Sequence, residues 1–262
     1  ITLEKSGYKT SEMSEMFKNM QEIRRLSGDN IPVFLLTHPI TTRRITESRE
    51  RARNAAKEGT IDSLNYKLIK SRVNFLMTDN LSIRALENNN YTTDEEIYFS
   101  ALLEKKKLNS TKSLEILKGL EKKYPDNLII KTSIAEIYTE SGNVGKSKKY
   151  TQDLLDISLG NYPLSYNLAN AYILEEDYIA AEQILEDIKF YRPVDITLLK
   201  DLSEVQLKSN NLLGFHLTNS EYLFYSGRYE EALRDLQQAR ALSTNNFKIR
   251  EIITERILIL QS

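Results

Sequence analysis

A spacing of 34 residues is the feature of this sequence that most constrains its fold. Small, aromatic and proline residues recur at this spacing or at twice it: Ala101, Ala135 and Ala169; Tyr138 and Tyr172; Pro125 and Pro193. A helical hairpin of this length cannot bury its apolar face alone, so neighbouring hairpins must stack. The period therefore predicts an all-α array of three units, 94–127, 128–161 and 162–195, in which the alanines lie where two helices approach closely.

The period, the early small residue and the closing proline resemble tetratricopeptide repeats, which form an α-α solenoid. The run from Gly227 to Ala232 resembles the middle of a further unit, one and a half periods after the third. We therefore expect an extra helix over 196–208, inserted as a half-unit, and a closing helix over 247–261. The second helices are expected to pack through Leu117 and Leu120, Leu154 and Ile157, and Leu185 and Ile188.

Composition limits the partners that the chain can have. In 262 residues, 36 Lys and Arg and 37 Asp and Glu give a net charge of −1, so there is no basic excess for nucleic acid. Cysteine is absent, which excludes disulfides and cysteinyl metal sites. No apolar run approaches the length of about 18 residues that a transmembrane helix needs, so we expect no transmembrane segment.

The first sixty residues do not follow the period. A helix is expected to begin near residue 10, and its apolar stripe is expected to pack in a core: Met13, Met16, Phe17, Met20 and Ile23. A short apolar segment then leads to Thr37-His38-Pro39, and Pro39 keeps His38 out of the α region. Thr41 can cap the helix that follows, to about residue 59. A loop histidine could ligate metal, shuttle protons, or simply bond to the backbone.

The segment around Thr37-His38-Pro39 carries a second resemblance. Leu35-Leu36-Thr37-His38-Pro39, followed by Arg44 and Arg49, resembles the end of the peptidase domain in bacterial zinc metallopeptidases of the β-barrel assembly-enhancing kind. The repeat array behind it is similar too. The resemblance implies remnant helices of a zinc peptidase domain over 1–60, connecting helices over 61–93 and a tetratricopeptide array over 94–262. It also implies that Thr37, His38, Pro39 and Arg44 belong to a lid loop, with His38 a candidate metal ligand in the intact enzyme.

The chain departs from this family at its chemical centre. Those enzymes hold zinc with His-Glu-x-x-His and a later glutamate. This sequence has two histidines, His38 and His216, and neither begins such a motif. We therefore expect the chain to bind no cofactor itself and to be inactive as a peptidase alone. Zinc would belong to the intact parent, with its ligands upstream of Ile1, and His216 is expected to be structural.

The resemblance implies a periplasmic enzyme that acts in outer-membrane protein assembly and quality control. Its array would dock proteins: unfolded or stalled outer-membrane proteins, the β-barrel assembly machinery, or its own peptidase domain. A stand-alone tetratricopeptide scaffold without peptidase activity is the alternative, and a His-Glu-x-x-His motif upstream of Ile1 would favour the enzyme. A third reading is that the array restrains the peptidase, in which case removal of residues 94–262 should raise cleavage.

The binding surface is expected on the first helix of each unit. Amides there can pair with a peptide backbone and rings can cover its side chains, although the same residues could simply form a solvated face. The groove candidates are Tyr98, Phe99, Lys105, Thr132, Glu136, Tyr166, Asn167, Asn170 and Asn219. The second unit carries Ser147 and Thr151 where alanine and a large apolar residue are usual. We expect the array to be least stable there.

Overall fold

The structure is a computed structural model that describes residues 6–9, 11–26, 42–53, 62–78, 91–244 and 246–261. Within these ranges every regular element is a helix and no strand occurs. The predicted all-α class is therefore confirmed. By its internal contacts the chain divides into two units, Ile1–Tyr66 and Lys67–Ser262. The finer division at residues 60 and 93 stays a prediction.

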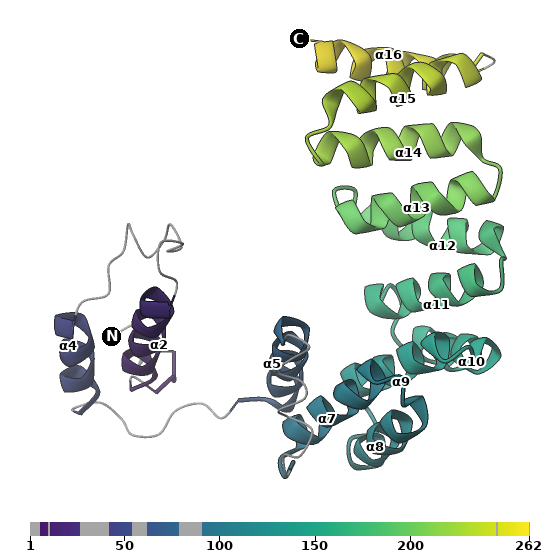
Figure 1. Cartoon of the computed structure of the whole chain (residues 1–262). Coiled ribbons are helices and arrows are strands. Elements are labelled where there is room, and N and C mark those ends of the chain that lie inside the picture. The colour runs from purple at the N-terminus through teal and green to yellow at the C-terminus, as the bar shows by residue number, and fades with distance from the viewer. Residues whose placement is uncertain are drawn as a thin grey trace. The chain divides into compact units, whose positions relative to one another are not determined.

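The first unit contains two helices that pack against each other, α2 (Glu12–Leu26) and α4 (Thr42–Arg53) (Figure 1). Ile45 is buried between them against Phe17 and Met20. The predicted apolar stripe is only partly covered, because Met16 is 41% exposed and Ile23 is 47% exposed. The segment before α4, with its Thr-His-Pro sequence and its predicted loop, lies outside the described residues.

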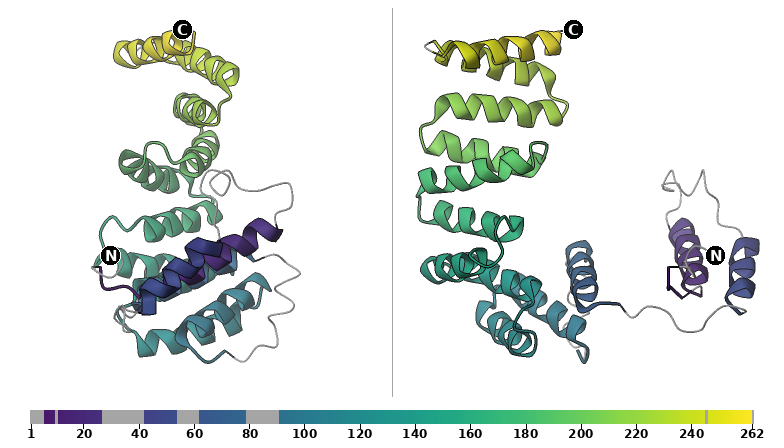
Figure 2. Two further views of the ribbon diagram at one scale, coloured as in Figure 1. Left: turned by 90° about the vertical axis from the view of Figure 1, so that its left-hand side faces the viewer. Right: turned by 180° about the vertical axis from the view of Figure 1, so that it is seen from behind.

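The second unit is a stack of helices (Figures 1 and 2). Its helices are α5 (Leu64–Met77, which begins in the first unit), α7 (Asp94–Lys106), α8 (Ser110–Lys123), α9 (Leu128–Glu140), α10 (Val144–Leu155), α11 (Tyr162–Leu174), α12 (Tyr178–Tyr191), α13 (Ile196–Lys208), α14 (Leu212–Tyr225), α15 (Tyr229–Leu242) and α16 (Phe247–Gln261). The first helices of the three predicted units begin at residues 94, 128 and 162, as the period requires. The predicted extra helix is α13, and the predicted closing helix is α16.

Side-chain caps explain where these helices begin. Before α7, Thr93 accepts the N–H of Glu96, and the Glu96 carboxylate accepts the N–H of Thr93, which is a capping box. Other helices start after an asparagine or aspartate whose side-chain oxygen accepts an N–H of the first turn. These caps are Asn109, Asn127, Asn161, Asp177, Asp195 and Asn211.

Two kinds of link join the helices. Three-residue turns close the hairpins, and their central residues are left-handed: Leu108 (φ 62°), Gly142 (φ 74°), Glu176 (φ 61°), Asn210 (φ 64°) and Gly227 (φ 76°). Longer links pass from one hairpin to the next, over 124–127, 156–161, 192–195 and 243–246. The helix α14 has a three-residue turn at each end. It is therefore the second helix of the α13 hairpin and the first helix of the α15 hairpin, which is how the half-unit enters the stack.

Small residues set the distance within each hairpin. Ala101, Ala135 and Ala169 are fully buried, as predicted. Twelve positions after each of the first two, a serine of the second helix donates to the alanine carbonyl: Ser113 to Ala101 at 2.7 Å and Ser147 to Ala135 at 3.3 Å. A side chain in these places would have to be small because two backbones meet there.

The predicted packing of the second helices is confirmed at all positions but one. Leu117, Leu120, Leu154, Leu185 and Ile188 are buried. Ile157 was expected in the same set, and this was wrong, since its side chain is 81% exposed. The reason is that α10 ends at Leu155, so Ile157 falls in the link to α11.

Bonds between alternate helices define two rows. In the first row, α5, α7, α9, α11 and α13 are joined through Arg72 to Glu136, Tyr98 to Ser133, Thr139 to Asn167, and Tyr166 to Asp201. In the second row, α8 is joined to α10, and α12 to α14 and α16, through Tyr150 to Glu121, Lys189 to Glu221, and Arg256 to Glu221. The first row is therefore a continuous strip of side chains from α5 to α13, whereas these bonds join the second row in two segments, α8 with α10 and α12 with α14 and α16.

Candidate protein-binding surface

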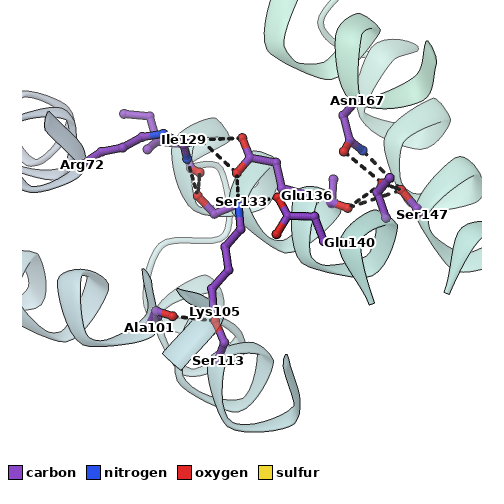
Figure 3. Close-up of polar contacts among 12 residues, drawn as sticks. Arg72, Ala101, Lys105, Ser113, Ile129, Ser133, Glu136, Glu140, Ser147 and Asn167 are labelled. Carbon is purple, nitrogen blue, oxygen red and sulfur yellow. Dashed lines mark hydrogen bonds and ion pairs between the residues drawn. The ribbon is translucent and has the colours of Figure 1, made fainter. Parts of the chain in front are cut away.

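The first row carries a network of charged side chains where α5, α7 and α9 meet (Figure 3). Arg72 donates to both carboxylate oxygens of Glu136, at 2.6 and 2.9 Å. Lys105 Nζ lies 3.2 Å from Glu136 Oε2 and 2.8 Å from Glu140 Oε1. Lys105 and Glu136 are each 19% exposed. These two predicted groove residues thus pair with each other and leave a narrow charged strip at the surface.

Tyr98 lies beneath this network and is completely buried. Its hydroxyl is 2.8 Å from Ser133 Oγ and accepts from Arg72 Nη1 at 3.4 Å. Burial alone would lower the pKa of Arg72, but the Glu136 carboxylate and the Tyr98 hydroxyl raise it above its usual value. Arg72 therefore stays charged and ties α5 to the array, while Tyr98 has no surface to offer a ligand.

Asn167 is also inside the array, at 5% exposure, where α9, α10 and α11 meet. Its amide donates to Ser147 Oγ at 3.2 Å and to Thr151 Oγ1 at 3.0 Å, and its carbonyl accepts from Thr139 at 2.9 Å (Figure 3). The four side chains satisfy one another, as buried polar groups must. Thr132, at 8% exposure, is likewise buried. Asn167 and Thr132 therefore contribute to the interior.

The accessible candidates on the first row are aromatic and amide side chains. Phe99 of α7 is half-buried, with its ring centroid 6.3 Å from that of Phe75. On α11, Tyr166 is half-buried and donates its hydroxyl to Asp201 of α13. Burial, and then the charge of Glu204, raises the pKa of Asp201. Asn170 is half-buried one turn further along α11.

Asn219 lies on α14, in the second row, so the structure does not bring it to the other candidates. Its amide donates to Asp235 of α15, and His216 Nδ1 lies 2.7 Å from the other oxygen of the same carboxylate. Both side chains thus join α14 to α15. His216 has the partner that a structural histidine would have.

The metal-related residues are only partly within the described ranges. Thr37, His38 and Pro39 lie outside them. Arg44 lies on α4 with its guanidinium 5.0 Å from the centre of the Phe17 ring. Among the described residues, no group of three or more His, Asp or Glu side chains could hold a metal ion. Because the sequence also lacks His-Glu-x-x-His, its residues do not fit a catalytic zinc site, and no step of peptide hydrolysis follows from them.

Arg72 is the residue of this surface that the sequence did not reveal. Its bonds to Glu136 span 64 positions, and no motif or period connects the two. Only the helical spacing of Leu68 and Ser71, which are buried on the same helix, could have indicated which face of α5 meets the array.

Stacked hairpins with a 34-residue period, left-handed three-residue turns and small residues at the closest approach define a tetratricopeptide-type repeat array, a class of protein-interaction scaffold. Among curated proteins, the "Putative beta-barrel assembly-enhancing protease" of Vibrio cholerae serotype O1 is 26% identical to the chain over 249 residues. The match covers 92% of this chain and 51% of that protein, so the chain spans about half the length of its relative. The predicted resemblance to such proteases is confirmed.

The chain was also compared with protein-family models and with solved structures. No protein-family model matches the chain. A MamA RS-1 ArsTM double mutant gives a TM-score of 0.46 at 11% identity, covering 63% of this chain and 92% of that one. A tetratricopeptide repeat protein from Parabacteroides merdae gives 0.43 at 14% identity, covering 94% and 100%. No helix within the described ranges is both long enough and apolar enough to cross a bilayer.

Proposed function

We propose that this chain is the partner-docking, non-catalytic part of a periplasmic zinc metalloendopeptidase that acts in outer-membrane protein assembly and quality control. The name of the Vibrio relative, which joins β-barrel assembly with a protease, supports the proposal. In this division of labour the array holds the client protein or the assembly machinery. Peptide cleavage, and the zinc that it needs, belong to a part of the enzyme that carries His-Glu-x-x-His.

The observation that carries the docking role is the continuous first row. Half-buried aromatic and amide side chains lie on its helices α7 and α11, namely Phe99, Tyr166 and Asn170, and the charged pair of Lys105 and Glu136 lies on α7 and α9. Rings cover apolar side chains of an extended peptide at low entropic cost, and amides or charged groups pair with its backbone and polar side chains. An unfolded outer-membrane protein offers both kinds of group.

Site-specific cross-linking in the natural full-length product tests this role. A photoreactive residue at Asn170, on the first row, should cross-link to an unfolded outer-membrane protein or to the assembly machinery. The matched control is the same residue at Lys149, which is exposed on α10 of the second row. Cross-links of equal yield at both positions, or at neither, would contradict docking on the first row.

A stand-alone scaffold without peptidase activity is the second candidate, because the array would serve either role. Zinc content and cleavage of an unfolded substrate, measured on the full-length product, separate the two. Bound zinc together with cleavage supports the enzyme. Cross-linking from Asn170 without zinc or cleavage supports the scaffold.

A further inference from the structure

A cavity of about 580 Å³ lies on the second row, lined by residues of α12, α14, α15 and α16. The half-unit enters the stack here, because α14 is the second helix of one hairpin and the first helix of the next. Glu221 of α14 binds both neighbours in the row, Lys189 of α12 and Arg256 of α16. The volume lies in the range of about 300–1,000 Å³ that is usual for pockets that take small ligands or a few side chains.

The walls of this α12–α14–α16 cavity include large apolar side chains that remain open to solvent. Phe190 is 80% exposed, Ile259 is 60% exposed and Tyr225 is 41% exposed. Phe224, which also lines the cavity, is 38% exposed. Covering this surface removes apolar area from water at about 25 cal/mol per Å², so exposed apolar groups gathered around a hollow favour an apolar ligand.

The charged side chains of the cavity differ in how far solvent reaches them. Lys189 Nζ is 2.9 Å from one oxygen of Glu221 and Arg256 Nη1 is 2.6 Å from the other, so two cations share one carboxylate. Lys189 and Glu221 are each 19% exposed, whereas Arg256 is 41% exposed. Of these three charged groups, the Arg256 guanidinium is therefore the one most open to solvent. At the α12 end, Glu186 accepts from Gln206 at 2.7 Å and can also accept a peptide N–H.

We propose that the α12–α14–α16 cavity binds a short extended peptide segment that inserts a large apolar side chain and carries an acidic side chain beside it. The apolar side chain lies among Phe190, Phe224 and Ile259. The acidic side chain pairs with the exposed edge of Arg256, since a guanidinium has five N–H donors and this one shares only part of them with Glu221. This inference rests on the proposed function, because it names one kind of segment that the array docks.

Fluorescence anisotropy with labelled synthetic nonapeptides and the 262-residue chain tests the inference. One peptide carries Phe-Phe-Asp in a Gly/Ser background, the second has Lys in place of Asp, and the third has Ser in place of both Phe residues. The first should bind most tightly. Phe190→Ala should weaken its binding by about fivefold or more, as expected for an aromatic anchor. Arg256→Gln should abolish the preference for Asp over Lys, and Arg256→Lys should retain it.

Two residues outside the cavity supply matched controls. Phe247, at the start of α16, is as exposed as Phe190, at 81% against 80%, and does not line this cavity. Arg228 pairs with Glu231 at 2.6 Å, the same distance as Arg256 with Glu221, and lies outside the cavity. Phe247→Ala and Arg228→Gln should leave the binding constant unchanged. Equal losses in the control variants, or a Lys peptide that binds as tightly as the Asp peptide, would overturn the proposal.

Two further outcomes separate this inference from the proposed function. If Asn170 cross-links to clients while no peptide binds the chain, the cavity proposal fails and the docking function stands. If Phe190→Ala instead dissociates a dimer in sedimentation velocity and leaves peptide binding unchanged, a second copy of the chain occupies the cavity, and the peptide proposal is overturned.

Discussion

At the residue scale, the cap of α7 makes stability depend on pH. The N–H groups of Thr93 and Thr92 donate to the Glu96 carboxylate at 3.0 and 2.9 Å, and they lower its pKa from 4.5 to about 2. A carboxylate with a lowered folded-state pKa contributes stability above its unfolded pKa and loses it as the pH falls toward the folded value. The difference in unfolding free energy between wild type and Glu96→Gln should therefore shrink between pH 4.5 and 2. Urea unfolding at several pH values measures it, and a difference constant over that window would contradict the cap.

A second residue-scale prediction concerns the close approach of α11 and α12. Ala169 is fully buried and packs in one cluster with Ala181, Leu185 and Leu202. Ala169→Leu should overpack this contact and cost about 1–3 kcal/mol of unfolding free energy. Ala241→Leu on α15, where the alanine is exposed, is the control, because both residues favour helices and nothing there needs a small side chain. Chemical denaturation of both variants would show whether the two losses differ.

At the element scale, the three-residue turns place residues other than glycine in the left-handed region. Leu108 has φ 62° and is 89% exposed, so its side chain gains nothing by burial. A left-handed conformation costs an L-residue roughly 1–2 kcal/mol in the folded state, and glycine avoids this cost. Glycine also raises the conformational entropy of the unfolded chain, which offsets part of the gain. Leu108→Gly should stabilise the chain by about 0.5–1 kcal/mol. The reverse change in the next hairpin, Gly142→Ala, should destabilise the chain because Gly142 has a left-handed φ of 74°, although no atom lies within 4 Å of the added Cβ. Thermal unfolding of both variants tests the pair.

The elements themselves were largely predictable, and the exceptions have physical reasons. Helix starts at 94, 128 and 162 follow from the period, because each hairpin must repeat the same contact. The left-handed turns at Leu108 and Glu176 carry no signal, since neither residue type prefers that conformation. Ile157 fits the helical pattern, yet α10 ends two residues earlier, and helix ends are the part of a pattern that spacing defines least.

At the scale of the whole molecule, the sequence predicted an array but not which side chains its surface presents. Tyr98, Thr132 and Asn167 lie on the expected helices, and each is buried. A helical period defines the faces of one helix, whereas the rotation between successive hairpins decides which face the neighbours cover. Long-range partners such as Arg72 and Glu136 depend on that rotation, and so does the cavity where α14 serves two hairpins.

The last prediction concerns how stability varies along the array. The helix α10 buries Ser147, Thr151 and Leu154, whereas the corresponding helix α12 buries Ala181, Leu185 and Ile188. A buried Leu or Ile contributes about 1.5–3 kcal/mol, whereas a hydrogen bond nets about 1 kcal/mol. The α10 N-cap, Asn143, makes no side-chain cap bond, while Asp177 caps α12.

Local opening of α10 should therefore cost less than opening of α12, because stability in a repeat array is a sum of local and nearest-neighbour contributions. Hydrogen exchange followed by mass spectrometry should find faster exchange for the amides of α10 under native conditions. Asp177→Ala, which removes a cap worth about 1 kcal/mol, should move the exchange of α12 toward that of α10. If α10 exchanged as slowly as α12 in the wild type, the polar network around Asn167 would be as stabilising as the apolar contacts that it replaces.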